Sequence, residues 1–167
     1  QTGGTYVDAT LGGGGHAVRI AEAAGPSGWL IALDRDPEAV ARAGWLKERG
    51  PARVTICQGD FRMLRKILDE LRVSEVDGVL FDLGVSSDQL EQPERGFSFQ
   101  QDGPLDMRMD PSGGLTAADL LNRLDEEKIA ELLWRYGEEP CARRLAAAIV
   151  ARRRQRPWTR TLELAEL

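Results

Sequence analysis

Short apolar runs alternate with segments of helical spacing through the first half of the chain. Four runs have the length and composition of strands and lie at residues 5–11, 29–34, 53–57 and 76–82. The clearest helix start between them is Asp36-Pro37-Glu38, which supplies an N-cap, a proline at N1 and a first-turn acid. Because such strands alternate with helices, we expect an α/β fold with a parallel sheet covered on both faces.

The pattern changes after the fourth run. Residues 84–114 show no sustained period and are rich in Gly, Pro, Asp and Met, which is typical of a long functional loop. Helical periodicity follows, beginning at Thr116 and Asp119, which have the spacing of a capping box. We therefore expect a first domain at 1–114, with the loop 84–114, and a helical subdomain at 115–167.

The fourth strand would be the last in the sheet, because only helical patterns follow it. Its outer edge would expose unpaired backbone groups. We expect that the sheet resumes after Leu167 in a longer protein, or that another chain, such as a second copy in a homo-oligomer, covers this edge. Because the chain starts at Gln1 instead of a methionine, we expect that an N-terminal segment precedes it.

Composition narrows the class of protein. Of 167 residues, 42% are hydrophobic and 29% charged, which excludes extended disorder, and no apolar run is long enough to span a bilayer. Two cysteines and one histidine provide neither a disulfide framework nor a zinc site. The spacing of Asp102, Asp106 and Asp110 matches no calcium loop. We expect a cytoplasmic domain without a membrane segment or a metal.

Positive charge gathers near the C-terminus, although the net charge is −5. From residue 135 onward there are eight arginines and four glutamates. Charges are screened over about 10 Å at 0.1 M salt, so such a region can attract an anionic partner whatever the global sign. The alternative is a solvated helix end whose arginines complement the helix dipole.

Residues 7–16 carry the strongest chemical signal. A strand there runs into Gly12–Gly15 and then into a helix, so backbone N–H groups can approach a ligand closely. Asp34 ends the second strand, where a carboxylate can accept hydrogen bonds from both ribose hydroxyls. This order predicts an adenosine-containing ligand at the carboxyl edge of the sheet and leaves a dinucleotide and S-adenosylmethionine both open.

Three further acids favour S-adenosylmethionine. Asp8, Asp60 and Asp82 follow the first, third and fourth strands, and carboxylates there suit a ligand with a sulfonium and an ammonium group. The pyrophosphate of a nicotinamide cofactor prefers bare N–H groups. The alternative is that these acids only cap turns or helices. His16 orders the glycine loop near the cofactor or has a purely structural role.

Six segments together resemble one known family. They are Thr10–His16, Ala32–Pro37, Phe81–Ser87, Arg95–Phe99, Asp102–Asp110 and Tyr136–Glu139. They are similar to the bacterial small-subunit (16S) ribosomal RNA cytosine-N4 methyltransferases, the RsmH or MraW family. The resemblance extends over essentially the whole chain, and Asp102–Asp110 is its most specific part.

The resemblance implies S-adenosylmethionine-dependent methylation of the exocyclic N4 amine of a cytidine in the decoding region of 16S ribosomal RNA. It implies a Rossmann-like class I methyltransferase sheet, of which this chain holds the first four strands, with a helical inserted subdomain. Residues 1–114 would bind S-adenosylmethionine, with the active-site loop at 84–114, and 115–167 would recognise the substrate. The implied partner is small-subunit ribosomal RNA or the 30S particle.

The family's cofactor contacts carry over residue by residue. They fall on Gly14, Gly15, His16, Asp34, Phe61, Asp82 and Gln89. The position of Asp34 is the ribose contact in the family, and that of Phe61 lies beside the adenine. All of these residue types are present in this chain.

The acceptor amine needs positioning, because the lone pair of cytosine N4 is delocalised into the ring. A hydrogen-bond acceptor that turns this lone pair toward the methyl group would promote transfer, with reacting atoms about 3–3.5 Å apart. Amine methyltransferases acting on DNA often use an Asp/Ser/Asn-Pro-Pro-Tyr turn, whereas this chain has Asp82-Leu-Gly-Val-Ser-Ser87. Asp82, Ser86 and Ser87 are therefore the catalytic candidates.

Candidate RNA contacts lie in the loop and near the C-terminus. Phe97 and Phe99 would hold a flipped base or would anchor the loop to the core. Arg108 would meet phosphates or pair with nearby carboxylates. The remaining candidates combine charge with a possible stacking ring: Arg152, Arg153, Arg154, Arg156 and Trp158.

Two other functions remain open on the sequence. The first is an NAD(P)-dependent Rossmann oxidoreductase, since a glycine-rich turn and Asp34 would serve a dinucleotide as well. The second is a truncated, non-catalytic fragment that binds the cofactor or RNA, because the sheet looks incomplete.

Overall fold

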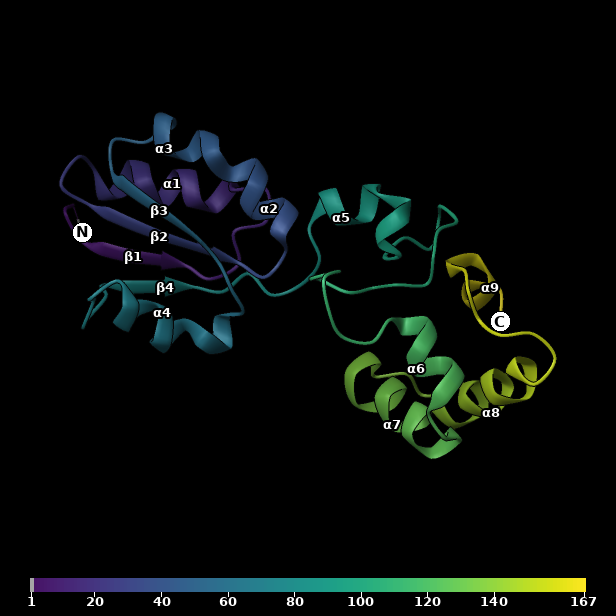
Figure 1. The fold of residues 1–167 in the computed structure, drawn as a ribbon. Coiled ribbons are helices and arrows are strands. Elements are labelled where there is room, and N and C mark those ends of the chain that lie inside the picture. The colour runs from purple at the N-terminus through teal and green to yellow at the C-terminus, as the bar shows by residue number, and fades with distance from the viewer. Residues whose placement is uncertain (1) are drawn as a thin grey trace. The chain divides into compact units, whose positions relative to one another are not determined.

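The computed structural model describes residues 2–167. The chain forms two compact units, Gln1–Asp88 and Gln89–Leu167 (Figure 1). The first holds the sheet and the second is helical.

The first unit is built on a four-stranded sheet of order β3-β2-β1-β4. The strands are β1 (Thr5–Asp8), β2 (Trp29–Asp34), β3 (Arg53–Gln58) and β4 (Gly78–Leu80). All three pairings are parallel, with Thr5 opposite Trp29 and Tyr6 opposite Gly78. The predicted parallel α/β sheet is therefore confirmed, and all of its carboxyl ends meet at one edge.

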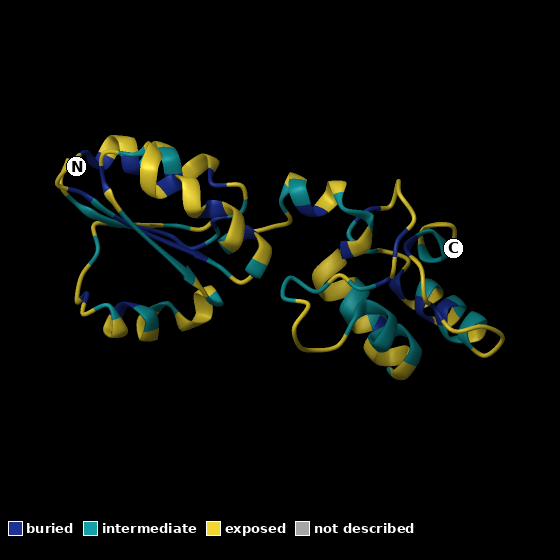
Figure 2. Ribbon diagram, turned by 45° about the horizontal axis from the view of Figure 1, so that its top comes forward, coloured by how far each residue is buried: buried dark blue, intermediate teal, exposed yellow. Residues whose placement is uncertain are grey.

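Helices cover both faces of this sheet (Figure 1). The elements are α1 (Gly15–Ala24), α2 (Pro37–Arg42), η1 (Ala43–Trp45), α3 (Leu46–Arg49), η2 (Phe61–Met63) and α4 (Leu64–Glu70). Leu30 and Ala32 of β2 face α1 and α3, whereas Ile31 and Leu33 face α4, and all four are 0% exposed. Because both faces are buried, β2 reads as a continuous apolar run instead of an alternating one. Figure 2 shows the buried, dark blue residues of the unit in the middle of its sheet, while the outer strands are teal and yellow.

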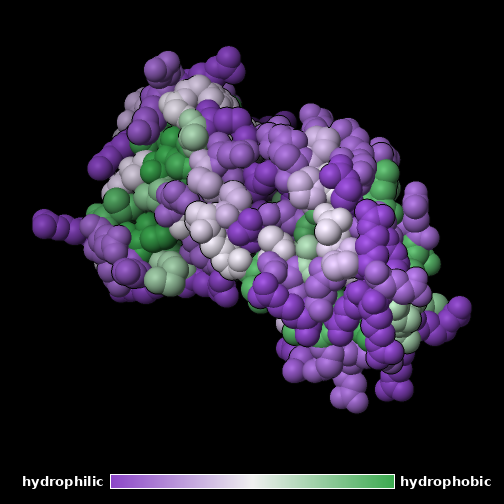
Figure 3. Space-filling model, turned by 45° about the vertical axis from the view of Figure 1, so that its right-hand side comes forward, coloured by the Kyte–Doolittle hydropathy of each residue, from purple (hydrophilic) through white to green (hydrophobic). Residues whose placement is uncertain are grey.

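β4 forms an open edge of the sheet within the described residues, because β1 is its only neighbour there. Val79, Phe81 and Leu83 are 40%, 46% and 67% exposed. Figure 3 shows hydrophobic side chains among the hydrophilic ones on the surface of the protein. A partner for this edge stays a prediction. None of the helices in residues 2–167 combines the length and hydropathy needed to cross a bilayer.

The second unit packs its helices around Trp158 and Leu105. Its elements are η3 (Pro93–Arg95), α6 (Ala117–Arg123), α7 (Glu126–Gly137), α8 (Ala142–Arg153) and α9 (Thr161–Ala165), and α5 (Ser87–Glu91) crosses the boundary between the units. The predicted capping box at Thr116 and Asp119 is present at the start of α6.

The units divide at 88/89, whereas the sequence pattern places the boundary at 114/115. The difference arises because part of the predicted loop packs against the helices. Leu105 is 3% exposed, lies in the same core as Trp158, and donates its N–H to the carbonyl of Thr159. Thr161 likewise donates its N–H to the carbonyl of Gly103. The loop is also partly helical, at α5 and η3.

Candidate functional site

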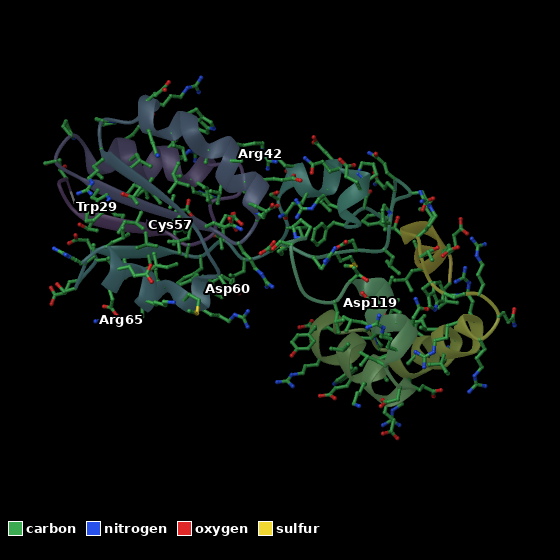
Figure 4. All side chains as sticks on the ribbon, viewed as in Figure 1. Trp29, Arg42, Cys57, Asp60, Arg65 and Asp119 are labelled. Atoms are coloured by element: carbon green, nitrogen blue, oxygen red, sulfur yellow. The ribbon has the colours of Figure 1, made fainter. Side chains whose placement is uncertain are left out.

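The carboxyl edge of the sheet collects the acids that the sequence analysis singles out in the first unit. Asp8 and Asp34 are the last residues of β1 and β2, and Asp60 and Asp82 follow β3 and β4. Figure 4 shows Asp60 at this end of the sheet and Trp29 at the opposite end. Crevices outside the carboxyl ends of strands are where open α/β sheets bind ligands.

The glycine loop between β1 and α1 is shaped by its backbone angles. Gly12 and Gly14 have φ of +49° and +81°, which strains any other residue. A Cβ on Gly14 would also lie 3.1 Å from the ring of Trp45. A Cβ on Gly15 would meet nothing within 4 Å, because this exposed residue borders open space at the start of α1. Gly14 therefore fixes the turn, while Gly15 leaves room for a ligand.

Asp34 holds this loop against β2. Its Oδ2 accepts from the N–H of Gly12 at 2.7 Å, and its Oδ1 accepts from the N–H of Asp36 at 2.8 Å. A carboxylate offers about four lone-pair positions, so each oxygen keeps one for a further donor. The half-buried side chain can thus fix the loop and still receive two hydroxyl groups.

Asp8 is the most unusual group at this edge. It is 0% exposed, and its Oδ1 accepts from the N–H of Thr10 at 3.1 Å. Its Oδ2 is buried and has no hydrogen-bond partner among the described residues. Burial raises the pKa of Asp8 above its ordinary value, although the Thr10 N–H and His16 act in the opposite direction. An unpartnered buried oxygen is unfavourable, and a cationic or N–H donor ligand would satisfy it.

His16 and Asp82 link the glycine loop to the residue after β4. The His16 Nε2 lies 3.3 Å from the Asp82 Oδ2, and both side chains are more than half exposed. The Asp82 N–H donates to the Thr10 hydroxyl at 2.7 Å. The structure therefore brings these two predicted contacts together, on a surface that a ligand can reach.

Phe61, which follows β3, lies beside Phe81, which follows β4. The two rings meet edge to face, with centroids 5.7 Å apart and planes at 85°. Phe61 is 40% exposed, so the pair leaves apolar surface open at the site. An exposed ring next to the strand ends is suited to contact a flat heterocycle.

Asp60 differs from the other acids. It caps η2 by accepting from the N–H of Arg62 at 2.9 Å, and the Arg62 guanidinium bonds both carboxylate oxygens. These hydrogen bonds lower the pKa of Asp60 to about 2. Asp60 is thus a helix cap paired with arginine. This agrees with the alternative given in the sequence analysis, in which the acids at the strand ends only cap turns or helices.

Sequence reasoning missed two residues near the loop. Arg42 and Trp45 line a cavity of 190 Å³ together with Gly12, Gly13, Ala39, Ala43 and Asp88. Arg42 pairs with Asp88 at 3.1 Å. Neither residue stands in a glycine-rich or strand-end motif, and only the folding of α2 and η1 beside the loop places them there.

The remaining catalytic and cofactor candidates have different surroundings. Ser86 lies beside the loop, since a Cβ on Gly12 would be 3.7 Å from the Ser86 Cβ. Ser87 is exposed at the start of α5. Gln89 is buried in the second unit, where its amide donates to the sulfur of Met109 at 3.4 Å.

The loop candidates for RNA contact also differ from one another. Phe99 is 70% exposed, while Phe97 is half-buried. Arg108 pairs with Asp106 at 2.7 Å, which is the expected pairing with a nearby carboxylate.

The structure corrects one expectation for the C-terminal cluster, which consists of Arg152, Arg153, Arg154, Arg156 and Trp158. Trp158 is 0% exposed, and its indole N–H donates to the Ile149 carbonyl at 3.1 Å. A buried ring has no free face for a base, so the expected stacking role of Trp158 is wrong. Arg153 donates to the carbonyls of Leu121 and Leu124, which makes it a link between helices.

The other arginines of this cluster divide by their partners. Arg152 lies over the Trp158 ring at 3.8 Å and pairs with Glu163 at 3.6 Å. Arg156 pairs with Glu163 at 3.1 Å. Arg154 is exposed and has no ion-pair partner among residues 2–167.

Comparison with known proteins finds relatives that all belong to one family of methyltransferases. The model of the MraW methylase family matches residues 1–167. Proteins named ribosomal RNA small subunit methyltransferase H are 54% identical over 100% of this chain in Thermomicrobium roseum and 50% identical over 100% in Geotalea uraniireducens. The same name applies in Xylella fastidiosa strain M12, at 54% identity over 98% of this chain.

This chain spans about half the length of these curated relatives: 51%, 54% and 51%. Among solved structures, a crystal structure of a candidate rRNA methylase from Clostridium thermocellum aligns with a TM-score of 0.45. It is 27% identical, and the alignment covers 52% of this chain and 45% of that one.

Proposed function

This chain belongs to the MraW methylase family, and from that premise we propose that it binds S-adenosylmethionine at the carboxyl edge of its sheet. We propose further that the protein methylates the N4 amine of a cytidine in the decoding region of small-subunit ribosomal RNA. The observation that carries the cofactor assignment is the unpartnered, buried Oδ2 of Asp8 beside the glycine loop.

The residues present fit this cofactor. Asp8 would accept from its ammonium group, Asp34 would receive the ribose hydroxyls, and Phe61 would contact the adenine. The backbone of Gly14 and Gly15 borders the space where the ligand would lie. When bound, S-adenosylmethionine supplies an electrophilic methyl group on sulfur. His16 and Asp82 are proposed contacts of the same site, and for Gln89 the family resemblance alone supports a contact.

The charge of this edge supports a cationic ligand over a dinucleotide. Asp8 and Asp34 lie at adjacent strand ends, and Asp82 follows the strand on the other side of β1. Carboxylates in these places would repel a pyrophosphate, which needs unshielded N–H groups. The oxidoreductase alternative is therefore less well supported.

The substrate amine would be positioned by acceptors at the end of β4. Asp82 is accessible, with 65% of its side chain exposed, and its backbone is held by Thr10. A carboxylate there can accept from the cytosine amine and turn the nitrogen lone pair toward the methyl group. Ser86 and Ser87 are the alternatives for this role, and Phe97 and Phe99 remain proposed contacts of the extruded base.

Methyl transfer by the full-length gene product tests this function. With methyl-labelled S-adenosylmethionine, we expect label at one cytosine N4, on 30S particles or on naked small-subunit RNA. Asp34→Ala should strongly reduce labelling at a cofactor concentration near the dissociation constant of the unchanged protein, and raising that concentration should restore part of it. Label on another base, or none despite cofactor binding, would overturn the proposal, and the second outcome would indicate the non-catalytic alternative.

A further inference from the structure

The cationic side chains of the second unit fall into two groups. Most of those described have a carboxylate or carbonyl partner: Arg95, Arg108, Arg123, Lys128, Arg135, Arg152, Arg153, Arg156 and Arg160. Three exposed arginines, Arg143, Arg144 and Arg154, have no such partner in the described part of the chain. Their charge is therefore free to meet an external anion.

These three arginines share one face of α8. An α-helix advances about 100° and 1.5 Å per residue, so Arg143, Arg144 and Arg154 fall within about 100° of arc and extend over about 16 Å. Ala147 and Ala151 lie between them and are exposed, while Ala146 and Ile149 turn inward to the core. Figure 2 shows buried and exposed positions alternating along the helices of this unit. The short alanines let a polymer backbone approach the helix between the charges.

A cavity adjoins this face. It has a volume of 870 Å³ and lies along α7 and the start of α8, with Arg143 and Arg144 among its lining residues. Trp134 also lines it and is 64% exposed, so the core does not require this indole. The cavity is also lined by three carboxylates, those of Glu126, Glu127 and Glu131.

We propose that this surface, the α8 face with the adjoining cavity, binds an unpaired stretch of RNA. The arginines contact phosphates, Trp134 stacks on a base, and the glutamates accept from the amino groups of that base. The face extends over about four or five nucleotide steps of a stacked strand at 3.4 Å each. This inference rests on the proposed function, because it takes the substrate to be RNA.

The mixed charge of the cavity favours a nucleotide over a cationic peptide. A lysine or arginine side chain would be attracted by the glutamates but repelled by Arg143 and Arg144. A nucleotide carries an anionic phosphate and neutral amino donors, so it complements both signs at once. Glutamate is one of the side chains that accept from the N4 amino group of cytosine.

Binding of this chain to an RNA fragment of the decoding region tests the proposal. The test variant carries Arg143→Gln, Arg144→Gln and Arg154→Gln. The matched control carries Arg123→Gln, Lys128→Gln and Arg160→Gln, which remove the same charge from paired side chains of the same unit. We expect the slope of log K against log salt to fall by about 2 in the test variant, at 0.7 per phosphate contact, and by less than 1 in the control.

Trp134 is tested in the same assay. Trp134→Ala should weaken RNA binding by about 5- to 100-fold, and Trp134→Phe should retain most of the affinity, because stacking needs only an aromatic face. Cofactor binding and thermal unfolding, measured on each variant, identify any variant that is misfolded. If Trp134→Ala is misfolded, the RNA affinity of Trp134→Phe decides whether an aromatic ring at this position is sufficient for binding.

The outcomes separate the two hypotheses. If the unchanged chain binds no RNA, this surface is not an RNA contact, and methyl transfer by the full-length protein still decides the proposed function. If it binds and the two triple variants show equal slopes, this surface is not the contact, while the proposed function stands. If an oligo-arginine peptide binds more tightly than RNA and Glu126→Gln with Glu127→Gln abolishes that binding, the surface recognises a basic protein segment and the RNA assignment is overturned.

Discussion

His16 Nε2 and Asp82 Oδ2 lie 3.3 Å apart and join two loops at the carboxyl edge of the sheet. His16 belongs to the first turn of α1, and Asp82 follows β4, the strand paired with β1. The contact therefore connects the glycine loop, which would hold the cofactor, with the residue proposed to position the substrate amine.

Replacing His16 should weaken this connection without unfolding the protein. An exposed pair contributes only about 0.2–1 kcal/mol to stability, so His16→Ala should leave the thermal midpoint nearly unchanged. Loss of the same energy from the ordering of the cofactor loop should lower the affinity for S-adenosylhomocysteine by about 1.4- to 5-fold. Calorimetry and thermal unfolding measure the two effects. A fall in the midpoint with unchanged affinity would assign His16 a purely structural role.

Asp8→Asn should make the protein more stable at neutral pH and a weaker cofactor binder. Burial raises the pKa of Asp8, and Asp34 and Asp82 add to the rise, while the Thr10 N–H and His16 oppose it. The stability associated with this carboxyl is fully present below its ordinary pKa of 3.8 and is lost as pH rises through the higher folded value. Asparagine does not ionise, so Asp8→Asn avoids this loss of stability. The variant should therefore be more stable than the unchanged chain near pH 7 and equally stable in acid.

Thermal unfolding of the Asp8 variant across pH checks this expectation. A lower midpoint than the unchanged chain at pH 7 would show that the carboxylate is already satisfied in the folded protein. Unaltered affinity for S-adenosylhomocysteine would remove Asp8 from the site.

Asp34→Ala should reduce cofactor affinity by about 1.5–3 kcal/mol, since charged hydrogen bonds to both ribose hydroxyls are lost. The substitution also frees the N–H groups of Gly12 and Asp36. Asp34→Asn keeps one acceptor oxygen and should lose less. Calorimetric titration of both variants gives the comparison, and equal affinities in all three proteins would exclude the ribose role.

Two tryptophans of the second unit should behave in opposite ways. Trp158 is 0% exposed in the core, so Trp158→Ala should lower the free energy of unfolding by about 3–5 kcal/mol. Trp134 is 64% exposed, so Trp134→Ala should change the free energy of unfolding little. Urea denaturation distinguishes them, and a small loss at Trp158 would contradict the core assignment.

The sequence predicts what depends on local pattern. The apolar run of β2, the N-cap at Asp36 and the capping box at Thr116 are all observed, because short-range spacing determines them. β4 extends only over Gly78–Leu80, shorter than the predicted 76–82, and within the described residues it pairs with β1 alone.

What the sequence does not predict depends on tertiary packing. Trp158 follows a run of arginines and resembles a stacking residue, yet the hydrophobic cluster with Leu105 buries it. Arg153 lies in the same run and is held by helix carbonyls. Spacing along the chain does not predict such contacts. Only the structure therefore shows that Arg143, Arg144 and Arg154 have no carboxylate or carbonyl partner in the described part of the chain.

Titration of the 167-residue chain with S-adenosylhomocysteine and, separately, with NADH tests the cofactor site most directly. The strand ends that would hold the ligand in the first unit all lie within this chain. We expect one saturable site for S-adenosylhomocysteine, weakened by Asp8→Asn and Asp34→Ala, and no binding of NADH. Binding of NADH alone, or of S-adenosylhomocysteine with equal strength in both variants, would contradict the site described.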